Sequence, residues 1–216
     1  MANKKHKNPF RYLPLDMARA VMSVLALAFR PKKLHVNGEK YKNKIRGGAI
    51  IASNHTGYSD PFRVASCFLH RRIFFLAAKE VMINKFFGFL LKGAGCISID
   101  RDQSDINAVR KCVDVLKDGK LLSVFPQGSI KDADEMNKIK SGAVLMALQA
   151  GVPIVPMYTQ KRKHWWNKTL IVFGDALNCK ELCPKRFPSV TDLDNLSGAL
   201  LEKMEECKKV YEQINK

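Results

Sequence analysis

A histidine and an aspartate lie five positions apart in the segment Asn54-His55-Thr56-Gly57-Tyr58-Ser59-Asp60, which directly follows the apolar run 49–52. Five residues of α-helix rotate a side chain by about 140°, so the two groups cannot share one face of a continuous helix. They can meet if the chain leaves a strand and turns, and Gly57 supplies backbone freedom for that turn. An imidazole held by a carboxylate can act as a general base. The segment therefore predicts an enzyme site at a strand-to-helix junction.

Both residues also have a purely structural interpretation. Asp60 precedes Pro61, which favours the first turn of a helix, and a carboxylate at that place can cap the helix by accepting from its first amides. A single histidine is more often a satisfied polar residue than a base. From this segment alone, catalysis by His55 and helix capping by Asp60 are both open.

Three further segments follow in a fixed order. They are Gly95-Cys96-Ile97-Ser98-Ile99-Asp100-Arg101, Phe125-Pro126-Gln127-Gly128-Ser129 and Val152-Pro153-Ile154-Val155-Pro156. Together with N-H-x4-D they resemble the four ordered blocks of the glycerolipid acyltransferase superfamily, which includes the lysophosphatidic acid acyltransferases. The resemblance covers residues 47–157. It implies an acyltransferase with a glycerol-3-phosphate acyltransferase-like fold and catalytic roles for His55 and Asp60.

The resemblance also implies a mechanism. His55 takes the proton of an acceptor hydroxyl as the hydroxyl attacks a fatty acyl thioester, and Asp60 orients the ring and stabilises its protonated form. The hydroxyl is itself the nucleophile, so no serine or cysteine nucleophile is needed. The expected co-substrate is an acyl-CoA or an acyl carrier protein thioester, with no permanently bound cofactor and no metal. Backbone amides near Gly128 are candidates for stabilising the oxyanion.

The acceptor is less clearly specified, because two positions depart from the family pattern. The family places the acceptor's phosphate on arginines of the second and third blocks. Arg101 keeps the first arginine, but Gln127 replaces a glutamate and Ile130 replaces the second arginine. Lys131 can attract phosphate as a point charge, although it lacks the planar fork of an arginine. The expected substrate-binding residues are Arg101, Gln127, Gly128, Ser129 and Lys131.

The favoured acceptor is 1-acylglycerol-3-phosphate, which acylation converts to phosphatidic acid. Two alternatives follow from the departures in the third block. One is an acyltransferase for a different acceptor, which includes acceptors without phosphate. The other is a catalytically silent relative that only binds lipid.

The chain of 216 residues has a formal net charge of +17, and the excess is concentrated near its start. Residues 1–46 contain twelve Lys or Arg against Asp16 and Glu39, a net charge of +10. Such a balance favours anionic partners, namely a lipid surface, nucleic acid or coenzyme phosphates.

Residues 12–29 favour the lipid surface. They are rich in Leu, Met and Val between basic flanks, and their uncharged stretch 20–29 has about half the length of a membrane span. Such a helix can lie in the membrane interface. The sequence therefore predicts a basic amphipathic membrane-interface segment over 1–35, and a peripheral or monotopic protein on the cytoplasmic face of an anionic membrane. A signal peptide ending at 26–28, or a helix packed on the core, stays open.

Two other classes of site receive less support. The segment 161–166 interleaves Lys, Arg and His with two tryptophans, which can stack bases but equally suit the headgroup depth of a membrane. No nucleic-acid partner is therefore expected. The six cysteines lack the paired spacing of a secreted framework or a zinc site, which indicates reduced thiols.

Strand and helix patterns alternate along the chain, which predicts an α/β fold with a mixed, largely parallel sheet flanked by helices. We expect one domain over 36–216. In such sheets the loops at the strand ends carry the site, where His55, Arg101 and Gln127 fall. Expected strands are 47–53, 73–78, 96–100, 120–125, 152–158 and 169–174. Expected helices are 61–70, 81–91, 104–118, 140–150 and 192–214. Phe86, Phe87, Phe89 and Leu90 line an acyl slot or belong to the core.

Overall fold

Seven strands form one sheet within the residues that the computed structural model describes. Those residues are 12–17, 20, 31–42, 45–57, 59–82, 85–100, 105–128, 139–160, 169–185 and 187–215. The strands are β1 (Lys32–His35), β2 (Ala49–Ser53), β3 (Ile73–Ala78), β4 (Cys96–Ile99), β5 (Leu121–Val124), β6 (Ile154–Thr159) and β7 (Leu170–Phe173).

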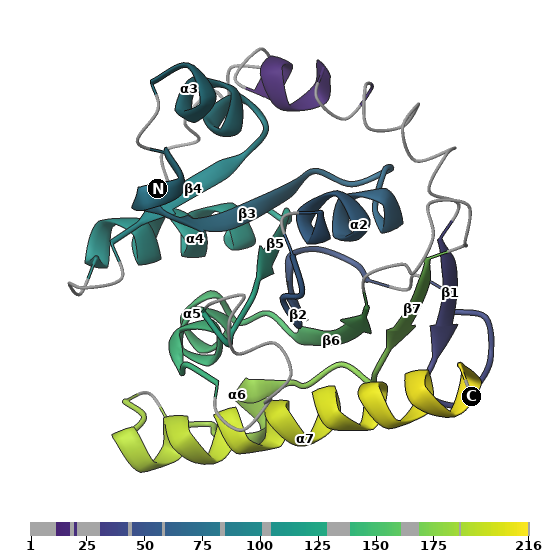
Figure 1. Ribbon diagram of the computed structural model, residues 1–216. Helices are drawn as coiled ribbons and strands as arrows, with labels where there is room; N and C mark the ends of the chain where they lie inside the picture. Colours follow the sequence, from purple (N-terminus) through teal and green to yellow (C-terminus); the bar gives the residue numbers. More distant parts are fainter. Residues whose placement is uncertain are drawn as a thin grey trace.

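The strands lie in the order β1-β7-β6-β2-β5-β3-β4. Every neighbouring pair is parallel except β6 and β7, which are antiparallel. The predicted mixed, largely parallel sheet is therefore confirmed (Figure 1). β2 lies at the centre of the order, between β6 and β5, so the residues that follow it emerge at the middle of the sheet's carboxyl edge.

Helices cover both faces of the sheet (Figure 1). They are α2 (Asp60–Cys67), α3 (Lys85–Gly93), α4 (Ile106–Lys117), α5 (Gly142–Ala150), α6 (Cys179–Leu182) and α7 (Val190–Ile214), with a 3₁₀ turn η2 (Lys79–Met82). Successive residues of β2 point to opposite faces. Ile51 packs in the cluster that includes Val64 of α2, and Ile50 packs in the cluster that includes α4, α5 and α7. Because both faces are covered, the strand is apolar along its whole length.

The six predicted strands and five predicted helices are all present, with ends that differ by a few residues. The predicted helix over 81–91 divides into η2 and α3. Strand β1 and the short helix α6 were not predicted. The sequence of β1, Lys-Lys-Leu-His, is typical of a basic linker, and its strand conformation depends on parallel pairing with β7.

The described part of the N-terminal segment is attached to the sheet. The Arg72 guanidinium donates to both carboxylate oxygens of Asp16, at 2.9 and 2.6 Å, and Leu15 is buried. Most of the predicted membrane-interface helix, and the segment 161–168, lie outside the described residues. No helix in the described part is long and apolar enough to cross a membrane. The division of the chain at residue 35 stays a prediction.

Gly48, which leads into β2, offers a test of this packing. A Cβ at this position would stand 2.1 Å from the backbone oxygen of Leu116 at the end of α4. We expect Gly48→Ala to lower the free energy of unfolding by about 1–3 kcal/mol, because two backbone segments must separate. Chemical denaturation measures this change. Gly198→Ala is the matched control, since nothing lies within 4 Å of its added methyl group and alanine favours α7. Equal stability of the two variants would contradict the packing.

Candidate active site

Asn54 fixes the end of the central strand. Its side-chain amide donates to the backbone oxygen of Thr159 at 2.8 Å, and its oxygen accepts from the backbone N–H of Thr159 at 3.0 Å. Asn54 is fully buried. This pair of bonds joins the chain after β2 to the end of β6, so the next residue, His55, leaves the sheet at a defined point.

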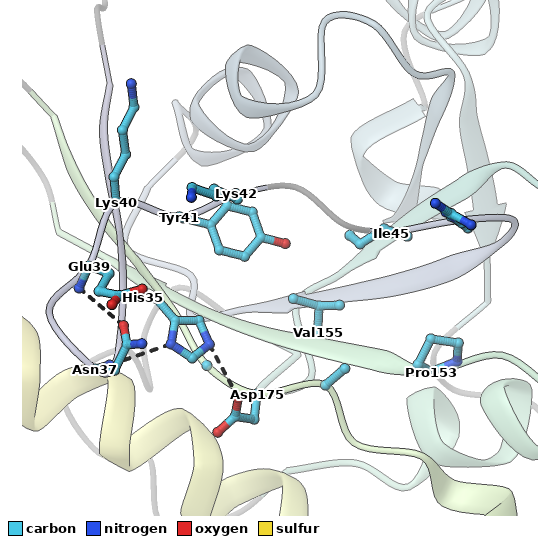
Figure 2. A pocket seen from close by; sticks show the side chains of 13 residues that line it. His35, Asn37, Glu39, Lys40, Tyr41, Lys42, Ile45, Pro153, Val155 and Asp175 are labelled. Carbon is cyan, nitrogen blue, oxygen red and sulfur yellow. Dashed lines mark hydrogen bonds and ion pairs between the residues drawn. The ribbon is translucent and has the colours of Figure 1, made fainter.

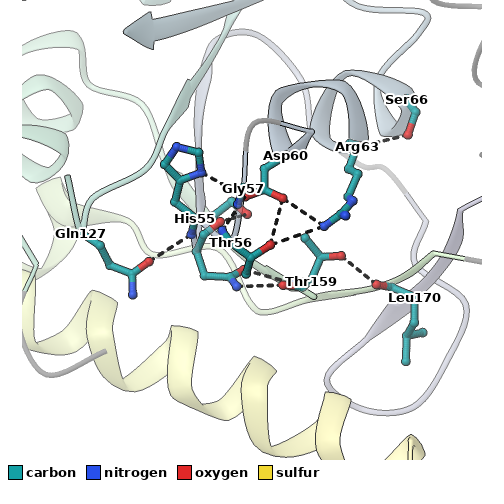
Figure 3. A network of polar contacts seen from close by, with 11 residues as sticks. His55, Thr56, Gly57, Asp60, Arg63, Ser66, Gln127, Thr159 and Leu170 are labelled. Carbon is teal, nitrogen blue, oxygen red and sulfur yellow. Dashed lines mark hydrogen bonds and ion pairs between the residues drawn. The ribbon is translucent and has the colours of Figure 1, made fainter. Parts of the chain in front are cut away.

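The predicted imidazole–carboxylate contact is present. Nδ1 of His55 lies 3.0 Å from Oδ2 of Asp60, the first residue of α2 (Figure 3). The Asp60 side chain is fully buried, whereas the His55 side chain is 16% exposed. A carboxylate can only accept, so in the neutral ring Nδ1 carries the proton and Nε2 keeps its lone pair. The ring therefore has the tautomer of a general base.

The remaining bonds of Asp60 hold its carboxylate in place. Oδ2 also accepts from the backbone amides of Thr56 at 2.5 Å and Gly57 at 2.8 Å. Oδ1 accepts from the Thr56 hydroxyl at 3.1 Å and from Nη1 of Arg63 at 3.0 Å. Burial alone raises the pKa of Asp60, but the bonds from His55, Gly57 and Thr56 and the charge of Arg63 outweigh it and hold this pKa below its ordinary value. Asp60 is therefore ionised at neutral pH.

Of the two interpretations of Asp60 that the sequence left open, helix capping does not apply. Ser59 occupies the N-cap position, and Asp60 is the first helical residue. Its carboxylate turns back to the amides of the preceding loop instead of those of the first helical turn. The described backbone of Thr56 and Gly57 thus closes around this carboxylate.

Two residues of the third block contact His55. The Phe125 ring stacks on the imidazole, with ring centroids 4.3 Å apart and an interplanar angle of 19°. Oε1 of the buried Gln127 accepts from the backbone N–H of His55 at 3.1 Å. A glutamate oxygen could accept the same bond, so this contact does not require the family's carboxylate. Substrate binding by Gln127 stays a prediction.

The oxyanion role of backbone amides near Gly128 stays a prediction, and the Gly128 amide itself is engaged in a turn. It donates to the backbone oxygen of Phe125 at 3.0 Å and closes a turn in which Gly128 has a φ of +84°. The turn brings in a cation that the sequence did not indicate. A Cβ at Gly128 would lie 3.2 Å from Cε and 3.5 Å from Nζ of Lys140, whose backbone N–H donates to Pro126. Lys140 therefore lies against the third block.

Other predicted site residues cannot be placed. Arg101, Ser129 and Lys131 lie outside the described residues. Of the four residues expected to line an acyl slot, Phe89 alone has a described side chain, and it is 75% exposed. Arg63, by contrast, was missed by the sequence analysis. No pattern in the sequence alone indicated Arg63. Once α2 is known to start at Asp60, Arg63 lies three positions later and therefore on the same side of the helix.

The described residues give no metal site, and a cavity among them lies away from His55. No group of three or more His, Cys, Asp or Glu side chains in the described ranges could hold a metal ion, and all six cysteines are free. A cavity of about 500 Å³ lies between Tyr41, Val155 and an ion pair of His35 with Asp175 (Figure 2). It lies at the start of β6, roughly 15 Å along the strand from Thr159 at about 3.3 Å per residue. It is therefore separate from His55.

The family model described as "Acyltransferase" matches residues 33–160, a range that contains His55, Asp60 and Gln127. The chain belongs to the acyltransferase family. Its resemblance to the glycerolipid acyltransferases is thereby confirmed, and the protein is an acyltransferase.

Individual relatives agree with this assignment. A 1-acyl-sn-glycerol-3-phosphate acyltransferase of Bacillus subtilis (strain 168) is 26% identical over 172 residues, which are 77% of this chain and 84% of that protein. A protein of the same name from Streptococcus pneumoniae is 29% identical over 140 residues, 64% of this chain and 51% of that protein. The chain thus spans about half the length of the second relative.

Two further comparisons concern the acceptor and the fold. A lyso-ornithine lipid O-acyltransferase of Rhodobacter capsulatus is 33% identical over 95 residues, 44% of this chain and 33% of that protein. The crystal structure of a 1-acyl-sn-glycerophosphate acyltransferase from Thermotoga maritima superposes with a TM-score of 0.56 at 17% identity. The superposition covers 90% of this chain and 79% of that one. At this identity the likeness shows the fold alone.

The bond between Gln127 and the His55 backbone leads to a prediction about the departure from the family pattern. Gln127→Glu keeps an acceptor oxygen for the His55 amide, whereas Gln127→Leu leaves that amide without this partner. We expect the leucine variant to lose about 1–3 kcal/mol of stability and to be the less active of the two. Thermal unfolding and kcat/KM measure both effects. A leucine variant as stable and as active as the parent protein would contradict a supporting role for Gln127.

Proposed function

We propose that the protein transfers a fatty acyl group from a thioester to the hydroxyl of 1-acylglycerol-3-phosphate, with phosphatidic acid as the product. The observation that carries the proposal is the Nδ1–Asp60 bond, which leaves Nε2 of a partly exposed His55 as a proton acceptor. The relatives named 1-acyl-sn-glycerol-3-phosphate acyltransferase support this acceptor.

The proposed reaction has two steps. Nε2 of His55 takes the hydroxyl proton as the oxygen attacks the thioester carbonyl and the carbonyl electrons move onto its oxygen. The intermediate then collapses, the carbon–sulfur bond breaks, and the leaving thiolate takes the proton back from the imidazolium. Asp60 stays ionised throughout and stabilises the imidazolium. The protein supplies no covalent nucleophile and requires no metal or bound cofactor in this scheme.

The acceptor's phosphate needs a cation near the third block, where the family arginine is replaced by Ile130. Lys140 supports this role because its ammonium lies against Gly128. Arg101 and Lys131 are the further candidates, and Ser129 is a candidate hydrogen-bond donor. A lysine binds phosphate as a point charge, so it selects the acceptor less sharply than a bidentate arginine.

The membrane is the proposed location of the reaction. The first 46 residues carry a net charge of +10, which suits an anionic lipid surface, and the apolar residues 12–29 suit the interface. We assign the protein to the cytoplasmic face, where acyl-CoA or an acyl carrier protein supplies the thioester. The acyl donor and the lyso-lipid are then the two small partners, and nucleic acid is not among them.

An acceptor without phosphate is the second candidate. It is favoured by the loss of the third-block arginine and by the lyso-ornithine lipid O-acyltransferase among the relatives. The ornithine headgroup is an amino acid and carries no phosphate. The two candidates share the His55 chemistry and differ only in the groups around the headgroup.

One assay separates the candidates. Purified protein is given labelled acyl-CoA or acyl carrier protein thioester and a mixture of lyso-lipids with and without phosphate, and the products are identified by mass. We expect phosphatidic acid, and we expect His55→Ala to reduce its formation by about 10²–10⁴ because the base is lost. Product from a phosphate-free acceptor would select the second candidate. If no acceptor leads to release of thiol, the protein is a catalytically silent, lipid-binding relative. A fully active His55→Ala variant would show that His55 is not the general base.

Lys140 gives an independent test of headgroup recognition. We expect Lys140→Ala to raise KM for 1-acylglycerol-3-phosphate, with little change in kcat, because a binding charge is lost while the base is intact. The effect should shrink as ionic strength rises. Steady-state kinetics measure both. Lys209→Ala, an exposed lysine of α7, is the control and should leave KM unchanged. An equal KM in the two variants would exclude Lys140 from phosphate binding.

A further inference from the structure

We propose that Arg63 is a positioning residue of the catalytic site: it fixes the Asp60 carboxylate through its second oxygen and sets how strongly the site favours protonated His55. The proposal rests on the assignment of His55 as the base. Arg63 does not touch the ring, so any effect on catalysis passes through Asp60.

The two oxygens of Asp60 have separate partners. Oδ2 serves His55 and the amides of Thr56 and Gly57, whereas Oδ1 serves the Thr56 hydroxyl and Nη1 of Arg63 (Figure 3). Nη1 also lies 3.5 Å from the Thr56 hydroxyl. Arg63 therefore holds the oxygen that the ring does not use, and rotation of the carboxylate away from His55 would break this ion pair.

Arg63 is itself well fixed. It follows Asp60 by three residues on α2, so the pair is held within one helix. Its side chain is only 4% exposed, and that of Asp60 is fully buried. Leaving either charge buried without the other is strongly destabilising. The pair thus forms a neutral, rigid unit under the imidazole.

The charge of this unit affects proton transfer. With Arg63 present, the three side chains carry no net charge before His55 takes a proton and +1 afterwards. Without Arg63 they would carry −1 before and zero afterwards, which favours the imidazolium. Arg63 therefore opposes excessive stabilisation of protonated His55 by Asp60. A base that holds its proton too strongly is blocked at neutral pH and returns the proton slowly to the leaving thiolate.

Other charged or titratable groups lie on elements at the same edge of the sheet. Tyr211 of α7 is close enough for the charge of Arg63 to act on it, although burial dominates and raises the pKa of that phenol. Lys140, before α5, lies beside Gly128, and Lys79 pairs with Asp100 at the ends of β3 and β4. Substitution at position 63 leaves these residues in place. Loss of the Arg63 charge would raise the pKa of Tyr211 further, so its phenol stays neutral over the pH range of the test. A difference in the pH profile or the ring titration among the position-63 variants therefore reflects the change of the Arg63 side chain.

The test compares Arg63→Met, which removes the charge, with Arg63→Lys, which keeps it. Both kcat/KM between pH 5 and 9 and the NMR titration of the His55 ring are measured. We expect the methionine variant to lose kcat with little change in KM for the thioester, and its acid limb to move to higher pH by about one unit. Arg63→Lys should return the acid limb of kcat/KM to the pH at which it lies in the parent protein. Arg72→Met is the control, because it removes a similar ion pair with Asp16. Both side chains of that pair are about one-third exposed, and the pair is distant from His55.

Several outcomes would overturn the proposal. An acid limb and a ring titration in Arg63→Met that coincide with those of the parent protein would reduce Arg63 to a packing residue. A shift that lysine does not correct would do the same. If Arg63→Met does not fold, Arg63→Gln is measured instead against the same criteria. A ring titration that moves while the rate profile stays fixed would support the coupling and remove His55 as the base, which separates this inference from the proposed function.

Discussion

The buried carboxylate of Asp60 is the group on which the site depends. A buried charge is costly unless hydrogen bonds and an opposite charge compensate it. Here one side chain accepts from the His55 ring, two backbone amides, a hydroxyl and a guanidinium. Those donors belong to the loop after β2 and to α2, so satisfying the charge also closes the loop and orients the ring. The bonds that stabilise the buried carboxylate are therefore the same bonds that hold His55 in place for catalysis.

The sheet supplies the frame for this loop. β2 is paired with β5 on one side and β6 on the other. The end of β6 holds Asn54 through two bonds, and the chain after β5 brings Phe125 against the ring and Gln127 against its backbone. Three strands that are distant in sequence thus meet at one histidine. This arrangement explains why the sequence blocks that carry the resemblance are separated by whole helices.

The sequence predicted the elements whose signals are local. Continuous apolar runs such as 49–52 and 121–124 indicated buried strands, and the five-residue spacing of His55 and Asp60 indicated a turn that brings them together. Features that depend on tertiary contact were missed or wrong. β1 is a strand only because β7 pairs with it, and Lys140 lies against the third block through a backbone bond to Pro126 that the sequence does not indicate. Whether Asp60 capped a helix or held the imidazole could not be decided from residue types, since both roles use the same carboxylate.

The tautomer of His55 tests the account most directly, because every later step assumes that Nδ1 carries the proton and Nε2 accepts one. Nitrogen-15 NMR of the ring in the resting protein at neutral pH distinguishes the two nitrogens. We expect a protonated Nδ1 and an unprotonated Nε2, with this pattern weakened when Asp60 is replaced by alanine. A ring protonated on Nε2, or one that exchanges freely between both tautomers, would contradict it.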